Sequence, residues 1–151
     1  MLIVVYVVLL FGLPCAPALA DRTGAVLDGD TLAVLHPQHP DRIRLSGIDC
    51  PEKGQAYGTR ATHAASALAF GKDVTIQMHG LDKYRRTPGN VILLDGTNVH
   101  QELVKQGWWW WYRTYASGDT VLEGLEKDAR EGRKGLWADP PPVPPWEWRK
   151  R

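Results

Sequence analysis

Three short segments of this sequence carry carboxylates and guanidinium groups close together. They are residues 28–31 (Asp28-Gly29-Asp30-Thr31), residues 44–52 (Arg44-Leu45-Ser46-Gly47-Ile48-Asp49-Cys50-Pro51-Glu52) and residues 82–86 (Asp82-Lys83-Tyr84-Arg85-Arg86). Carboxylates bind hard cations and can act as general bases, and guanidinium groups hold phosphate oxygens bidentately. The segments therefore predict an enzyme that cleaves phosphodiesters.

A cation site is predicted from Asp30 and Asp49, which each lie where an expected strand gives way to a turn. Such positions let carboxylates from distant parts of the chain converge. Carboxylates, a backbone carbonyl and water form the usual shell of Ca²⁺, and no Cys/His set here has zinc spacing. The predicted metal is Ca²⁺. Because Asp-Gly-Asp is also a common turn sequence, the prediction depends on the other two segments.

The remaining charged groups fit the attack of water on phosphorus. Glu52 follows Asp49 by three residues, so its carboxylate could remove a proton from a water held beside the cation. Arg44 and Arg86 could clamp the phosphoryl oxygens and offset the charge of the transition state. Either arginine alone would be typical of a surface ion pair, but the combination favours catalysis.

Short strands and a few helices must position these residues. Alternating β-prone runs predict a three-stranded meander and two later strands, over residues 25–27, 31–35, 42–45, 72–79 and 91–94. The last strand enters a tight turn at Asp95-Gly96. Apolar spacing predicts helices over residues 57–70, 98–106 and 121–134, with Gly71, Gly107 and Gly135 at their ends and a Thr120/Glu123 capping box opening the third. We expect an α+β, mainly β, fold: a five-stranded OB-like barrel with about three helices.

The first twenty residues predict export. They lack charged side chains, are apolar over residues 2–13, and end in Ala18-Leu19-Ala20, the small-x-small pattern that signal peptidase cuts. We expect cleavage before Asp21 and a secreted or periplasmic protein. Left uncut, residues 1–20 would be an N-terminal anchor, although Pro14 and Pro17 interrupt the span.

The length, charge and cysteine content of the 151-residue chain limit how many domains it can form and how it can contact nucleic acid. It is long enough for one domain, residues 21–139, followed by a Pro/Trp-rich tail, residues 140–151. With 18 basic and 17 acidic residues, the formal net charge of +1 excludes uniform electrostatic coating of nucleic acid, so contacts must come from local placement of Arg and Lys. Cys50 is the sole cysteine after the leader, which excludes an internal disulfide.

Aromatic residues gather in two places. In the run Trp108-Trp109-Trp110-Trp111-Tyr112 we expect the inward rings to be core, while exposed rings could stack on unpaired bases. The tail ends in Trp146-Glu147-Trp148-Arg149-Lys150-Arg151. It either packs its Trp rings back on the domain or makes a cationic, aromatic contact with an envelope or nucleic-acid surface.

These motifs resemble the thermonuclease family, whose type member is staphylococcal nuclease. The resemblance covers nearly the whole chain after the leader: Val26-Leu27-Asp28-Gly29-Asp30-Thr31, Arg44-Leu45-x-Gly47-Ile48-Asp49-x-Pro51-Glu52, Tyr57-Gly58-x-x-Ala61, Asp82-Lys83-Tyr84-x-Arg86, Glu102-Leu103-Val104-x-x-Gly107 and Gly135-Leu136-Trp137. It implies an OB barrel with helices. It also implies Ca²⁺-dependent endonucleolytic hydrolysis of DNA and RNA to 3′-phosphate products.

The resemblance also assigns roles to residues. Ca²⁺ would be bound by Asp30, Asp49 and the backbone carbonyl of Cys50; the catalytic residues would be Arg44, Glu52 and Arg86; and the substrate would contact Lys83, Tyr84, Arg85 and Tyr115. Three features depart from the family pattern, and one of them is the run of residues 108–112, which is richer in tryptophan than the family pattern. Cys50 replaces a threonine, which preserves a carbonyl ligand and leaves the thiol as a small half-buried group or a redox switch. Arg85 replaces a glycine and would either strain its loop or add a phosphate contact.

We therefore predict a sugar-nonspecific nuclease that prefers single strands and acts as a monomer. One alternative is a non-catalytic OB-fold module that binds nucleic acid or protein, but the presence of Arg44, Glu52 and Arg86 argues against it. Another is a surface-attached interaction protein that works through the Trp-rich tail. Truncation after Asp139 would then abolish function, whereas Glu52→Ala would not.

Overall fold

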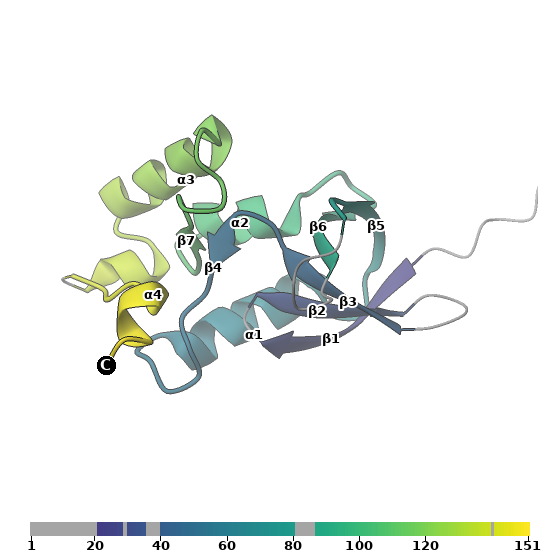
Figure 1. Ribbon diagram of the computed structural model, residues 1–151, viewed down its shortest axis with the longest axis horizontal. Coiled ribbons are helices and arrows are strands. Elements are labelled where there is room, and N and C mark those ends of the chain that lie inside the picture. Colours follow the sequence, from purple (N-terminus) through teal and green to yellow (C-terminus); the bar gives the residue numbers. More distant parts are fainter. Residues whose placement is uncertain (1–20, 29, 36–39, 81–86, 140) are drawn as a thin grey trace, which may run out of the picture.

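A closed five-stranded barrel forms the centre of the molecule (Figure 1). The computed structural model describes residues 21–28, 30–35, 40–80, 87–139 and 141–151. The barrel strands are β1 (Asp21–Asp28), β2 (Thr31–Leu35), β3 (Pro40–Leu45), β5 (Asp73–Met78) and β6 (Thr87–Leu93). Their order is β1-β2-β3-β6-β5, with β5 closing on β1; β3 and β6 run parallel and the other pairs antiparallel. The predicted OB-like barrel is confirmed.

Alternation along the strands explains the barrel core. Leu32 and Val34 on β2 and Ile43 and Leu45 on β3 are each at most 1% exposed. In a strand, residues two apart point to the same face, so these four side chains all face the barrel interior. On β3 the sequence itself shows this period, because Ile43 and Leu45 alternate with Arg42 and Arg44.

Three helices confirm the sequence prediction: α1 (Gly58–Ala69), α2 (Val99–Lys105) and α3 (Thr120–Glu131). Two short helical segments follow, the 3-10 helix η1 (Gly135–Ala138) and α4 (Pro145–Trp148), and the sequence did not predict them. In Figure 1, α3 and α4 lie on the side of the molecule away from β5 and β6.

The ends of α3 differ from the prediction. Asp119, not Thr120, caps the helix, because its carboxylate accepts hydrogen bonds from the backbone N–H groups of Val121 and Leu122 at 3.1 and 3.0 Å. The helix ends at Glu131, and Gly135 opens η1 instead of ending α3. A Cβ atom on Gly135 would lie 2.4 Å from the carbonyl oxygen of Gly107, so this glycine permits a close backbone approach.

A second, two-stranded sheet was not predicted. It pairs β4 (Ile48–Asp49) with β7 (Trp110–Trp111) in antiparallel register, with Asp49 opposite Trp110. Two-residue strands are too short to show a periodic pattern. This pairing attaches a predicted metal ligand to the tryptophan run, in which Trp109, Trp110 and Trp111 are buried as expected of core rings.

The end of β6 also differs from the prediction. The strand was predicted over residues 91–94, but β6 runs over Thr87–Leu93, and the Leu94 side chain beyond its end is 70% exposed. The predicted tight turn at Asp95-Gly96 follows, with the Gly96 N–H donating to the Leu93 carbonyl at 2.9 Å, and after a single bridge between Ile92 and Asn98 the chain enters α2 as predicted.

The predicted leader, residues 1–20, lies outside the described residues. Among the helices that the structure does describe, we find none with the length and apolar character needed to cross a bilayer.

Buried His100 predicts that stability falls in mild acid. This α2 residue is 4% exposed, and burial lowers its pKa from 6.5 to about 4. The unfolded chain therefore takes up a proton between pH 6.5 and 4 that the folded protein excludes, so stability is lost as pH falls through this window. Between pH 7 and pH 5 the loss in free energy of unfolding attributable to His100 is about 2 kcal/mol.

Urea unfolding at pH 7 and pH 5 measures this loss. His100→Gln should lose less free energy of unfolding than wild type, whereas His63→Gln, at an exposed position, should lose as much as wild type. Equal losses in all three proteins would contradict the assignment to His100.

Candidate active site

A cavity of about 370 Å³ brings together two of the three charged segments. Its lining comes from β1, β2, β3, β4, the loop after β4 and the C-terminal segment. It includes five of the predicted site residues: Asp30, Arg44, Asp49, Cys50 and Glu52. The third segment, with Lys83, Tyr84, Arg85 and Arg86, lies outside the described residues, so its roles stay predictions.

Strand pairing places Arg44 beside Asp30. Thr31 on β2 is opposite Arg44 on β3, and the backbone N–H of Leu45 donates to the Asp30 carbonyl at 2.9 Å. The side chains form an ion pair with an Nη1–Oδ2 distance of 2.7 Å. The guanidinium group is thus held at the cavity wall by the barrel itself.

The two predicted metal ligands are buried. Asp30 is 7% exposed and Asp49 is 1% exposed. A buried carboxylate is costly unless it is paired and hydrogen-bonded. Besides the Arg44 pair, Asp30 accepts a hydrogen bond from the Thr31 hydroxyl at 3.1 Å. The site therefore concentrates negative charge where a cation or a guanidinium group can offset it.

A tight loop holds Glu52 at the cavity mouth. The Glu52 backbone N–H donates to the Gln55 side chain at 3.2 Å, and the Gln55 N–H donates back to the Glu52 carbonyl at 2.9 Å. Gly58 packs against the same carbonyl, and a Cβ atom there would lie 1.9 Å from the oxygen. The Glu52 side chain remains 43% exposed, so solvent water can reach its carboxylate.

The Cys50 side chain is buried, and its thiol is unreactive. Burial raises the pKa of its thiol, and the carboxylates of Asp30, Asp49 and Glu52 raise it further. A neutral thiol is neither a good metal ligand nor a reactive nucleophile. Of the two interpretations of Cys50, the structure therefore favours the small buried residue over the redox switch, and the role of its backbone carbonyl as a metal ligand stays a prediction.

Sequence reasoning missed Arg149, which enters the cavity from the C-terminal segment. Its Nη2 and Nη1 lie 2.6 and 3.2 Å from the two Asp49 carboxylate oxygens, and Nη1 lies 2.9 Å from Glu52 Oε1. These hydrogen bonds, the one to Asp49 first, raise the pKa of Arg149. The residue is 97 positions from Glu52, so no local spacing signals the contact.

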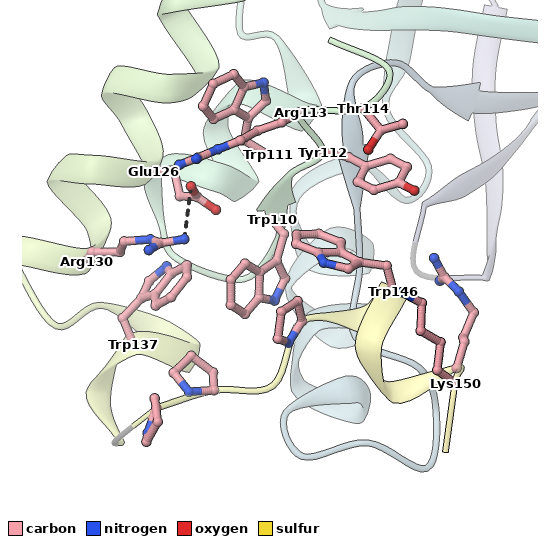
Figure 2. Close-up of a pocket in the computed structure, with 14 residues that line it drawn as sticks. Trp110, Trp111, Tyr112, Arg113, Thr114, Glu126, Arg130, Trp137, Trp146 and Lys150 are labelled. Carbon is pink, nitrogen blue, oxygen red and sulfur yellow. Dashed lines mark ion pairs between the residues drawn. The ribbon is translucent and has the colours of Figure 1, made fainter. Parts of the chain in front are cut away.

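A larger aromatic cavity of about 820 Å³ adjoins this site, and Arg149 lines both. Figure 2 shows Trp110 and Trp137 beside each other, with Trp146 of the C-terminal segment facing Trp110. The Trp146 ring stacks on Tyr112 with a centroid distance of 5.1 Å. Of the two alternatives for the tail, Trp146 therefore follows the first: its ring packs back on the domain.

Tyr115, predicted to line the nucleotide pocket, is not among the residues that line the charged cavity. It is 73% exposed, and its ring packs edge-on against Tyr112 at 4.9 Å. Its predicted contact with substrate stays a prediction.

The donors that face the cavity suit a hard cation. In the part of the chain that the structure describes, no three His, Cys, Asp or Glu side chains are grouped to hold a metal. A cation here would be bound by the carboxylates of Asp30 and Asp49, a backbone carbonyl and water. Ca²⁺ accepts such an all-oxygen shell, whereas zinc sites use thiolate or imidazole ligands. The residues present therefore fit Ca²⁺.

Comparisons with known proteins agree on one family. The model of the family described as staphylococcal nuclease homologue matches residues 42–139. The chain is 45% identical over 130 residues to an uncharacterized endonuclease of Escherichia coli O157:H7, covering 86% of this chain and 84% of the relative. It is 39% identical over 148 residues to a micrococcal nuclease of Shigella flexneri, covering 89% and 84%. An uncharacterized endonuclease of Haemophilus influenzae is 36% identical over 131 residues, covering 86% and 72%.

Proposed function

This chain belongs to the staphylococcal nuclease homologue family and is a nuclease, and we propose that it is a Ca²⁺-dependent endonuclease that hydrolyses DNA and RNA to 3′-phosphate products. One observation carries the proposal: Asp30, Arg44, Asp49 and Glu52 converge in one cavity. Cation ligands, a base and a phosphate-binding group are thereby within reach of one substrate phosphate.

Bound Ca²⁺ would supply charge stabilisation for the phosphate oxygens and lower the pKa of a water ligand. Glu52, at the open mouth of the cavity, accepts a proton from the attacking water. Arg44 donates hydrogen bonds to a phosphoryl oxygen as negative charge builds there. The water oxygen bonds to phosphorus, the bond to the 5′ oxygen breaks, and that oxygen takes up a proton from solvent while Glu52 releases its own to solvent, so the phosphate remains on the 3′ side.

Substrate range and location are also proposals. The family resemblance supports action on both DNA and RNA, with single strands preferred, by a monomer. Export to the periplasm or medium is supported by the apolar, uncharged residues 1–20 and their Ala18-Leu19-Ala20 ending. Asp21 is the first residue of β1, so cleavage before it would leave the barrel strand whole.

Circular single-stranded DNA tests this function, because a circle has no ends for an exonuclease. With Ca²⁺, we expect the purified protein to linearise the circle and then shorten it, leaving ends that become extendable by polymerase only after a 3′-phosphatase has acted. An intact circle in the presence of folded protein would contradict endonuclease activity. Ends that are extendable at once would contradict 3′-phosphate products.

A further inference from the structure

We propose that Arg149 competes with the cation for Asp49, so that metal binding releases the C-terminal segment, residues 141–151, from the active site. Arg149 would then be an internal competitor that sets the affinity of the enzyme for Ca²⁺. This inference rests on the proposed function, because it takes Asp49 as a metal ligand.

The geometry of the ion pair leaves Asp49 little capacity for a second cation. Arg149 engages both Asp49 oxygens, through contacts of 2.6 and 3.2 Å, and Asp49 is 1% exposed. Such a two-pronged pair is the strong form of a charge-assisted hydrogen bond. A metal that binds an Asp49 oxygen must therefore displace at least one of these contacts.

Electrostatics favour departure of the guanidinium group over a shared site. A divalent cation and Arg149 on the same carboxylate would lie a few ångströms apart, where like charges repel strongly in a partly buried cavity. Arg44, which pairs with Asp30, belongs to barrel strand β3, so its backbone is fixed by the sheet. Arg149 directly follows the short helix α4, so it can leave while the barrel stays intact.

Among the described residues, the other attachments of the C-terminal segment are the buried Pro145, a hydrogen bond and ring contacts. The Gln55 side-chain amide donates to the Val143 carbonyl, and the Trp146 ring packs on Trp110 and Tyr112. The helix α4 is four residues long, too short to be stable without these contacts. Loss of the Arg149 pairs would therefore loosen the whole segment and uncover one face of the Tyr112 ring.

The test compares wild type, Arg149→Ala and Arg151→Ala by calorimetric titration with CaCl₂ after removal of metal with a chelator. Arg151 carries the same charge two residues on, and its guanidinium group lies over the Trp148 ring, 5.6 Å from the ring centroid. We expect Arg149→Ala to bind Ca²⁺ about tenfold more tightly than wild type, because the competing state is removed. Arg151→Ala should bind as wild type does.

Hydrogen exchange of the wild-type protein gives a second readout that is independent of any substitution. Saturating Ca²⁺ should speed amide exchange in residues 141–151 while it slows or leaves unchanged exchange in the barrel strands. Equal Ca²⁺ affinity in all three proteins, or a segment whose exchange Ca²⁺ does not speed, would overturn the competition and leave the proposed function standing. If neither wild type nor Arg149→Ala binds Ca²⁺, the calcium chemistry of the proposed function fails together with the competition.

Discussion

Glu52→Gln should lower the rate of DNA cleavage by about 10² to 10⁴, the usual contribution of a positioned general base. The amide has almost the shape of the carboxylate but cannot accept the proton of the attacking water. The loop around residue 52 should keep its form, because backbone and Gln55 contacts hold it. Single-turnover cleavage of a single-stranded oligonucleotide at saturating Ca²⁺ measures the effect on the chemical step.

Glu123→Gln is the matched control for this substitution. Glu123 is exposed on α3 and does not line the charged cavity, so its amide variant should cleave at the wild-type rate. Equal cleavage by Glu52→Gln and wild type would remove Glu52 from the mechanism. Thermal melting of both variants establishes that any loss of rate is not a loss of fold.

Arg44→Lys should lower kcat by about 10² to 10³, the cost of losing one preorganised donor to a developing oxyanion. Lysine keeps the positive charge and can still pair with Asp30, so the buried carboxylate is not left uncompensated. It lacks the planar fork that holds an oxygen of the carboxylate and an oxygen of phosphate together. Steady-state kinetics should therefore show the loss mainly in kcat.

The barrel offers a matched control for that substitution as well. Arg22 on β1 pairs with Asp73 on β5 at 3.0 Å, which is again an arginine of the barrel paired with an aspartate, but this pair is on the surface. Arg22→Lys should leave kcat unchanged. If Arg44→Lys were as active as Arg22→Lys, the positive charge of residue 44 alone would suffice. The hypothesis that the Arg44 guanidinium group clamps the phosphoryl oxygens would then be wrong.

Local pattern was enough to predict the barrel and the convergence of most of its charged residues. Ile43 and Leu45 alternate with Arg42 and Arg44 along β3, and Asp30 and Asp49 stand beside turns, so the inner face of that strand and the position of the site both follow from local pattern. The cap of α3 was assigned one residue late, because Asp119 and Thr120 are both good capping residues and only the folded backbone distinguishes them.

What the sequence did not predict depends on long-range contacts. The β4–β7 pairing joins two-residue strands with no period of their own. Arg149 was assigned to a tail that could pack on the domain, and nothing in its neighbourhood indicates that it reaches Asp49, 100 residues earlier. Contacts of this kind are determined by how the C-terminal segment packs on Trp110 and Tyr112, which is a property of the assembled fold.

Metal dependence is the most direct test of the central claim that this cavity is the active site of a Ca²⁺-dependent nuclease. Cleavage of single-stranded DNA should be followed with Ca²⁺, with excess EGTA, and after Ca²⁺ is restored in excess of the chelator. We predict rapid cleavage, no cleavage and full recovery, in that order. Cleavage that continues undiminished in EGTA, or none by the folded protein in Ca²⁺, would contradict the account.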